Sequence, residues 1–228
     1  MQYSDTVRGR FIRRPNRFIA EVELDGETVI CHVKNTGRCR ELLTDGATVI
    51  LQKASGENRR TNYDLIAVYK GENLINIDSQ APNKVFYEWV RGGHFIDGLT
   101  LIRPETVYGD SRFDLYAEAG ERKIFAEVKG VTLEEDGVAM FPDAPTERGL
   151  KHLRGLIDAK RNGFEAYAVF VIQMSGCKYF TPNRKTDPKF ADAIRKAHNE
   201  GVKILCLSCT VTENTLAIAS EPIVSFII

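Results

Sequence analysis

The most informative part of this sequence is residues 111–130, which read SRFDLYAEAGERKIFAEVKG. Polar and apolar residues alternate through both halves of this stretch, and that period predicts two β-strands joined at Gly120-Glu121. Glycine suits the first position of a type II′ turn, so we expect a two-residue loop that places Ala119 opposite Arg122. The sequence therefore predicts a tight antiparallel hairpin in this stretch.

The register of this hairpin decides which side chains share a face. Counting outward from the loop places Asp114 opposite Glu127, with Lys129 two residues further on. Two carboxylates and an ammonium on one patch of sheet suit a divalent cation better than they suit stability. The alternative is that the three are ordinary solvent-facing residues with one cross-strand ion pair. The face expected to be apolar comprises Phe113, Leu115, Ile124, Ala126 and Val128, with Tyr116 and Phe125 on the other face.

Length and charge bound the possible classes of protein. The 228 residues suffice for one large domain or two small ones, and a hydrophobic content of 43% is typical of a globular protein. Lys plus Arg and Asp plus Glu both number 31, so the molecule as a whole has a formal net charge of zero. Basic residues nevertheless gather near the start of the chain, at Arg8, Arg10, Arg13, Arg14 and Arg17. Such a local cluster predicts contacts to backbone phosphates of a nucleic acid.

Cysteine usage and the lack of apolar runs predict a cytoplasmic protein with no membrane partner. Five cysteines are an odd number and suit a reducing compartment. No leader-like or membrane-length apolar run occurs. Cys206 and Cys209 have zinc-knuckle spacing, but no second pair accompanies them, and buried free thiols are the favoured interpretation.

Residues 1–80 predict a small β-barrel of the oligonucleotide-binding (OB) type. Short apolar-polar runs alternate with turn signals such as Asp25-Gly26, and the only helix expected is a turn or two over 38–43. A polar, basic loop is expected over 55–61. The alternative is a small barrel with no ligand.

Residues 81–228 predict a mixed α/β domain. Pro82 suits the first turn of a helix over 83–91, and further helices are expected over 147–162 and 187–200. The apolar runs at 166–172 and 202–207 predict strands buried on both faces, and residues 131–139 are expected to extend the sheet. On the helix over 147–162 one flank carries Arg148, Lys151 and His152, a set suited to a phosphate.

Common catalytic motifs are absent. The sequence has no Gly-x-Ser-x-Gly, no P-loop, no Gly-x-Gly-x-x-Gly and no His-Glu-x-x-His. The constellation with catalytic chemistry in it is therefore Asp114, Glu127 and Lys129.

An Asp on one strand and Glu-x-Lys on the next, with Glu88 on a preceding helix, resembles the restriction-endonuclease-like PD-(D/E)XK nucleases. Phe113 stands where the motif has Pro. Over nearly its full length the chain also resembles the sugar fermentation stimulation protein A (SfsA) family, through residues 31–38, 111–114, 127–132 and 140–153. That resemblance implies an OB-like N-terminal domain, a restriction-endonuclease-like C-terminal domain, DNA binding and a link to sugar utilisation genes.

The nuclease resemblance implies roles for individual residues. Asp114, Glu127 and the Val128 carbonyl would hold Mg²⁺ or Mn²⁺, and Lys129 would orient the attacking water or stabilise charge on the phosphate. Glu88 would bind a second ion or the water. Contacts to DNA are expected from Arg8, Arg10, Arg13, Arg14, Arg17, Lys34, Arg38, Arg148, Lys151 and His152.

Two other functions stay open at this stage. One is a transcriptional regulator that binds DNA and keeps the nuclease fold without cutting. The other is a small-molecule-binding barrel fused to a structural domain, which leaves the basic cluster unexplained. The sequence does not fix the oligomeric state, and a homodimer stays open.

Overall fold

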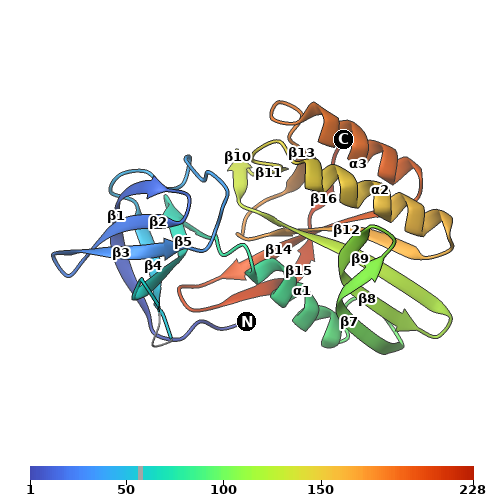
Figure 1. Ribbon diagram of the computed structural model, residues 1–228, viewed down its shortest axis with the longest axis horizontal. Helices are drawn as coiled ribbons and strands as arrows, with labels where there is room; N and C mark the ends of the chain where they lie inside the picture. The colour runs from blue at the N-terminus through green and yellow to red at the C-terminus, as the bar shows by residue number, and fades with distance from the viewer. Residues whose placement is uncertain (56–58) are drawn as a thin grey trace.

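The computed structural model describes residues 1–55 and 59–228, which form a β-barrel followed by an α/β domain (Figure 1). Residues 56–58 of the expected basic loop lie outside the described part. The barrel strands are β1 (Thr6–Asn16), β2 (Ile19–Leu24), β3 (Glu27–Val33), β4 (Thr48–Lys53) and β5 (Tyr63–Lys70). They lie in the order β3-β2-β1-β4-β5, and β3 also pairs with β5, so the sheet closes. The expected OB-like barrel is confirmed.

Local chemistry explains the barrel's hairpins and one wrong prediction. Asp25 and Gly26 both have positive φ, 52° and 83°, as the two-residue β2–β3 turn requires. The helix expected over 38–43 does not form, because Cys39 has a φ of 45° and only one turn closes there, from Leu43 N–H to the Cys39 carbonyl. The loop is instead held by the Arg14 guanidinium.

The chain then leaves the barrel through β6 (Asn73–Asn76), which pairs with β5, and enters the helix α1 (Ala81–Arg91). The main sheet of the second domain has the strand order β15-β14-β12-β9-β8-β7. Its strands are β7 (Leu99–Tyr108), β8 (Ser111–Ala119), β9 (Arg122–Val131), β12 (Glu165–Ile172), β14 (Lys203–Val211) and β15 (Leu216–Ile223).

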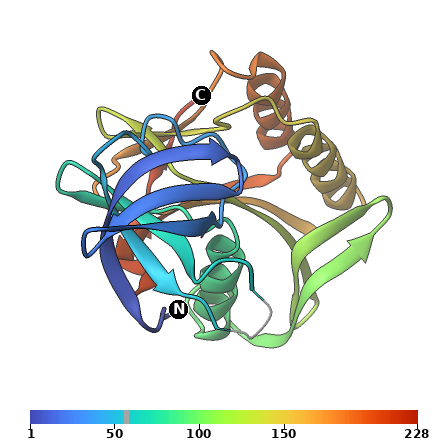
Figure 2. The same cartoon turned by 60° about the vertical axis from the view of Figure 1, so that its left-hand side comes forward.

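Helices cover both faces of this sheet (Figures 1 and 2). Alternate residues of β12 pack to opposite sides: Phe170 joins the cluster under α2 (Glu147–Arg161) and α3 (Pro188–Asn199), whereas Val169 joins the cluster that contains α1. Side-chain caps begin both long helices, since Thr146 Oγ1 accepts from Gly149 N and Asp187 Oδ1 from Phe190 N. The continuous apolar run over 166–172 is therefore a strand buried on both faces, as expected.

A second, smaller sheet has the order β10-β11-β13-β16. Its strands are β10 (Leu133–Glu135), β11 (Val138–Phe141), β13 (Tyr179–Pro182) and β16 (Ser225–Phe226). The expectation that residues 131–139 extend the main sheet is wrong, because β10 and β11 pair with each other and β11 with β13. Phe180 stacks on Phe170 at 4.3 Å between ring centroids, which fixes this sheet against the α2 and α3 face.

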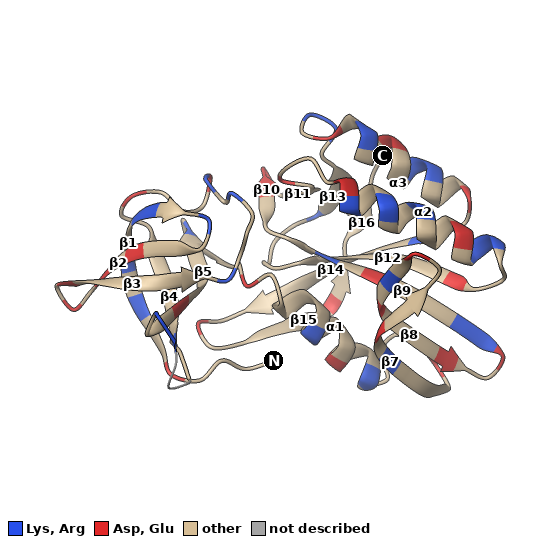
Figure 3. Cartoon of the chain, viewed as in Figure 1, with Lys and Arg blue, Asp and Glu red and all other residues tan. Residues whose placement is uncertain are grey.

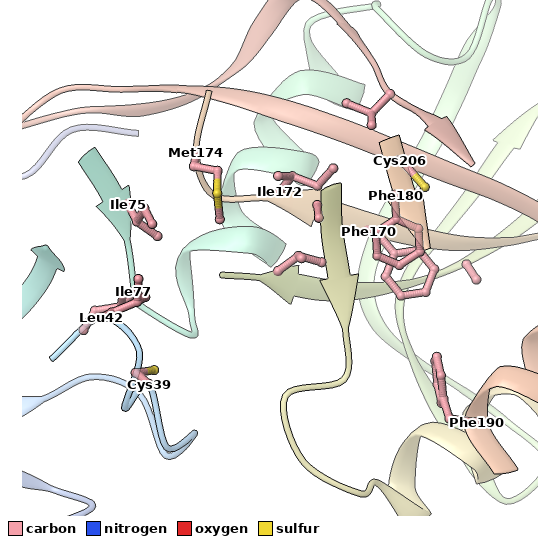
Figure 4. Packing of buried hydrophobic residues seen from close by; sticks show 14 of the residues in the cluster. Cys39, Leu42, Ile75, Ile77, Phe170, Ile172, Met174, Phe180, Phe190 and Cys206 are labelled. Atoms are coloured by element: carbon pink, nitrogen blue, oxygen red, sulfur yellow. The ribbon is translucent and has the colours of Figure 1, made fainter. Parts of the chain in front are cut away.

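Apolar contacts run without a break from the barrel into the α/β domain (Figure 4). Ile75 and Ile77 at the end of the barrel, together with Met174 after β12, belong to one buried cluster. A buried polar network reinforces this junction: Gln173 Nε2 donates to Asn76 Oδ1 at 2.9 Å and to the Asp78 carbonyl at 3.0 Å, and Lys34 Nζ pairs with Asp78 at 2.6 Å.

The first residues of the chain also bind the second domain. Tyr3 N–H donates to the Asn214 carbonyl at 2.8 Å, and the Met1 amine donates to the Leu216 carbonyl at 2.8 Å. No helix within the described ranges is long and apolar enough to cross a membrane.

We predict that Gln173→Ala lowers the free energy of unfolding by about 1–3 kcal/mol, because it removes two buried hydrogen bonds, one to Asn76 Oδ1 and one to the Asp78 carbonyl. Urea unfolding measures this. Asn73→Ala, which removes two exposed hydrogen bonds with Ser175, both 3.3 Å long, is the control and should cost less than about 0.5 kcal/mol. Equal losses in the two variants would contradict the role given to Gln173.

Candidate metal and phosphodiester site

The central hairpin has the register that the sequence predicts. β8 and β9 pair from Ala119↔Arg122 to Leu115↔Ala126 across the two-residue loop, and Gly120 has a φ of 61°. Asp114 and Glu127 are the next positions beyond the last of these pairs. The two carboxylates are thus brought to the same point of the sheet.

Beyond the pair Leu115↔Ala126 strand β8 separates from β9, and the Asp114 side chain replaces the backbone hydrogen bonds of the ladder. Asp114 Oδ2 accepts a hydrogen bond from the Val128 N–H at 2.7 Å. The N–H and C=O of one strand residue project to the same side, so the Val128 carbonyl also faces the gap that β8 leaves. Two carboxylates and this carbonyl therefore border one opening in the sheet.

Where β8 separates from β9, successive apolar side chains of β8 change from one face of the sheet to the other. Phe113 packs against Phe125 on the side of α2, with ring centroids 5.2 Å apart, while Leu115 lies in the cluster on the side of α1. The expected single apolar face containing both Phe113 and Leu115 is therefore wrong. On the neighbouring strand Glu105, between the pairs Pro104↔Leu115 and Thr106↔Phe113, has a φ of 50°. The irregular backbone on both strands turns Asp114 toward the opening.

Glu127 is almost fully buried, with 3% of its surface exposed. Its Oε1 contacts Lys129 Nζ and His152 Nδ1, whereas Oε2 has no hydrogen-bond partner among the described residues. Burial raises the pKa of Glu127, but the hydrogen bonds and charges of His152 and Lys129 outweigh it, so the net pKa is below the ordinary value. Glu127 is therefore an ionised carboxylate with one oxygen still available.

The pKa of Asp114 is shifted in the opposite direction, above the ordinary value. Burial and the neighbouring charge of Glu127 raise its pKa, although the Val128 N–H, Lys129 and Asn83 act in the other direction. Asn83 Nδ2 donates to Asp114 Oδ1 at 2.7 Å from the first turn of α1. Nothing in the sequence pattern singled out Asn83; its signal is only a polar residue directly after the helix-starting Pro82.

Helix α2 brings a histidine onto the carboxylates. His152 is buried, its Nδ1 lies 3.3 Å from Lys129 Nζ, and Arg148 Nε donates to His152 Nε2 at 3.5 Å. The His152 ring thus faces Glu127 with Nδ1 and Arg148 with Nε2. Lys151 is exposed instead and lines a different hollow, with Ser111 and Arg154. Of the three expected phosphate contacts, Arg148 and His152 join the site and Lys151 stands apart from it.

A cleft of about 650 Å³ opens beside Asp114 on the side of α1. Its lining residues are Gln80, Asn83, Lys84, Phe86, Tyr87, Pro104, Glu105, Asp114, Leu115 and Val128. A half-apolar concave site of this size suits part of an organic ligand next to a polar reacting centre.

The structure does not bring Glu88 to the carboxylates. Its Oε2 binds the Met1 amine at 2.8 Å, the side chain is 46% exposed, and it lines a separate hollow with Trp89 and His94. Asn83 faces Asp114, and a residue five positions later lies roughly 140° further round a helix. The role expected for Glu88 is therefore corrected.

Most of the expected basic contacts on the barrel are neutralised inside the protein. Arg8 pairs with Glu213, Arg10 with Glu23, Arg13 with Glu21 and Lys34 with Asp78. Figure 3 shows the basic and acidic positions interleaved over β1 and β2. Arg14, Arg17 and Arg38 form no such ion pair with a described residue, and Arg40, which the sequence analysis did not single out, joins them.

Side chains alone do not form a metal cluster in residues 1–55 and 59–228: no group of three or more His, Cys, Asp or Glu is arranged to hold an ion. The candidate donors are the two carboxylates and the Val128 carbonyl.

The fold and this site define a two-domain protein in which an OB barrel precedes a mixed α/β domain. Residues 12–77 match the model of the SfsA N-terminal OB domain, and residues 80–215 match that of the sugar fermentation stimulation protein RE domain. The chain belongs to the sugar fermentation stimulation protein family.

Relatives match over nearly the whole chain. A sugar fermentation stimulation protein homolog of Desulfitobacterium hafniense (strain Y51) is 61% identical over 95% of this chain and 94% of its own length. One of Ruminiclostridium cellulolyticum is 53% identical over 97% and 98%. The solved structure of Pyrococcus furiosus SfsA in complex with Ca²⁺ aligns with a TM-score of 0.89 at 28% identity, over 100% of this chain and 98% of that one.

We predict that the pKa of Asp114 responds to both neighbours in metal-free protein. Glu127→Gln removes a like charge and should lower this pKa, whereas Lys129→Met removes an opposite charge and should raise it. Carboxyl NMR titration in the presence of a chelator measures both shifts. Glu118→Gln, elsewhere on β8, is the control. An Asp114 pKa that is the same in Glu127→Gln as in the parent would contradict the geometry of the site.

Proposed function

We propose that this protein is a divalent-metal-dependent DNA phosphodiesterase whose reacting centre is Asp114, Glu127 and Lys129. The observation that carries the proposal is the juxtaposition of a half-buried carboxylate, Asp114, whose pKa is raised, and a buried one, Glu127, with an unpartnered oxygen. Such a pair is unfavourable without a positive charge between the two groups.

The donor set fits Mg²⁺ or Mn²⁺. These ions take oxygen ligands, are commonly held by one or two carboxylates and keep several waters. Asp114, Glu127 through Oε2, and the Val128 carbonyl would hold the ion. The complex of Pyrococcus furiosus SfsA with Ca²⁺ is a property of that relative, and it supports a divalent-cation site in this fold.

When bound, the ion supplies an activated water and neutralises charge on the phosphate. The chain's own residues supply position and further charge. Lys129, already in contact with Glu127, would donate to the attacking water or to a phosphate oxygen. His152 keeps Glu127 ionised and oriented, and Arg148 behind it would contact a neighbouring phosphate.

DNA as substrate is supported by the pattern that resembles PD-(D/E)XK nucleases and by the arginines on the barrel that have no carboxylate partner. Membership of a family named for sugar fermentation stimulation supports a role at sugar utilisation genes.

One observation favours a second function, a DNA-binding regulator that does not cut. Glu127 Oε1 is already satisfied by Lys129 and His152, so the site is partly neutralised without metal. In that case the carboxylates would be a remnant of the nuclease fold, and the arginines would carry the function.

We predict cleavage of DNA with Mg²⁺ or Mn²⁺, assayed on duplex, single-stranded and branched substrates. Asp114→Asn should abolish metal binding in calorimetry and cleavage together, while DNA affinity in a chelator stays close to that of the parent. Lys129→Met should retain metal and slow cleavage by about 10²–10³-fold, as loss of one transition-state donor does.

Glu88→Gln is the matched control and should leave cleavage unchanged, since Glu88 binds the Met1 amine. Cleavage that survives Asp114→Asn, or no metal binding by the parent, would refute the catalytic proposal in favour of the non-cutting regulator.

A further inference from the structure

We propose that the barrel binds an unpaired nucleic-acid strand in a hollow lined by arginines and directs that strand along the domain junction to the carboxylates. The binding half stands on the barrel's own geometry, whereas delivery for cleavage rests on the proposed function. The substrate is then single-stranded nucleic acid, or DNA with an unpaired segment.

The hollow has a volume of about 520 Å³. Its lining, which we call the arginine hollow, comprises Arg14, Asn16, Arg17, Thr36, Gly37, Arg38, Arg40, Leu43 and Ala144. The residues come from the end of β1 and the β1–β2 turn, from the loop between β3 and β4, and from the connection before α2. Two loops of the barrel and one segment of the α/β domain thus enclose one concave surface.

The charge of this hollow is not cancelled by acidic partners. None of its four arginines forms an ion pair with a carboxylate of the described residues, in contrast to Arg10 and Arg13 on the same barrel. Arg14 is locked in place, since its guanidinium donates to the carbonyls of Asn35, Gly37, Arg38 and Arg17. Arg14 thus uses its donors to hold the loops in place, and the three exposed arginines, Arg17, Arg38 and Arg40, offer their donors to phosphates.

An aromatic side chain stands next to these charges. Phe18 follows Arg17 in the β1–β2 turn and is 50% exposed, and the Arg17 guanidinium lies 5.6 Å from the centre of its ring. A half-exposed phenylalanine gains little in a barrel without a ligand. Stacking of a base on such a ring, beside a basic groove, is how OB barrels hold single strands.

The hollow continues toward the carboxylates. A second hollow of about 340 Å³ shares Thr36, Gly37 and Ala144 with it and extends to Gly130 on β9 and Thr146 at the start of α2. Ser79 lines this second hollow, and the next residue, Gln80, lines the cleft that contains Asp114 and Val128. Asp143 is the one carboxylate among the described residues that line the first two hollows, against four arginines.

An unpaired strand fits these features better than a duplex does. A base can stack on Phe18 only if its face is free, and in a duplex the neighbouring pairs cover that face except at an end. The hollow is concave and enclosed by loops, whereas a duplex presents its phosphates on a convex surface. The strand would pass from the arginine hollow along the junction, with one nucleotide reaching the half-apolar cleft beside Asp114.

The test is fluorescence anisotropy of the full chain with labelled 15-nucleotide oligo-dT and a 15-base-pair duplex, in a chelator so that cleavage plays no part. We expect at least tenfold tighter binding of the single strand. Phe18→Ala should weaken that binding at least fivefold, since a stacked base contributes about 1–3 kcal/mol. Arg38→Ala with Arg40→Ala should reduce the log–log salt slope by about 1.4 as well as the affinity.

Arg184→Ala with Arg195→Ala, on the far helix α3 and its preceding loop, is the charge-matched control and should leave both quantities unchanged. Equal or tighter binding of the duplex, or hollow variants that bind like the control, would overturn the proposal.

Single-turnover cleavage with Mn²⁺ tests delivery separately. The hollow variants should raise the protein concentration needed for half-maximal cleavage without lowering the maximal rate; a lowered maximal rate at unchanged half-maximal concentration would overturn delivery. If the parent binds oligo-dT as expected and cuts nothing, the catalytic proposal and delivery fail, and the single-strand site stands.

Discussion

The hydrogen bond from the Val128 N–H to the Asp114 carboxylate marks where β8 stops pairing with β9 in the middle of the main sheet. A backbone donor at that place would otherwise need a strand partner or water. By supplying the acceptor from a side chain, Asp114 lets β8 turn away without leaving the donor unsatisfied. The cleft beside α1 is then lined by Asp114 and Val128, while Glu127 lies buried against His152 of α2, so the chemistry of the site follows from this one interruption of the ladder.

The surroundings of the opening are arranged to tolerate it. On one side α1 contributes Asn83 to Asp114, and on the other α2 contributes His152 to Glu127. The close approach of α2 to β8 depends on Gly155, where a Cβ would lie 2.7 Å from Ser111 Oγ. Burial raises the pKa of both carboxylates, and the net shifts differ in direction because Asp114 faces the charge of Glu127 whereas Glu127 is bound by His152 and Lys129.

How far the sequence predicts this structure depends on the range of the interaction concerned. The two-residue loop at Gly120-Glu121, the buried strand β12 and the helix starts at Thr146 and Asp187 follow from local patterns, and all agree with the structure. The register of β8 and β9 follows from that loop, so the approach of Asp114 to Glu127 could be predicted, although the ladder ends one pair before them. The closed barrel follows from the spacing of short strands.

Interactions between distant segments could not be predicted in this way. Asn83 and His152 reach the site because α1 and α2 pack on opposite faces of the sheet, and Glu88 misses it because it projects from α1 roughly 140° away from Asn83 and binds the Met1 amine. Likewise the arginine cluster near the start of the chain is evident in the sequence, but only the fold shows which arginines meet glutamates. The turn at Cys39, which replaces an expected helix, depends on carbonyls captured by Arg14 from another strand.

The central claim is that the opening between β8 and β9 holds one divalent cation. Anomalous diffraction from crystals soaked with Mn²⁺ tests it, because the anomalous scattering of Mn²⁺ locates the ion. The account predicts a peak about 2.0–2.6 Å from oxygens of Asp114 and Glu127 and from the Val128 carbonyl. No peak at this position at saturating Mn²⁺, with Lys129 and His152 still bound to Glu127, would contradict it.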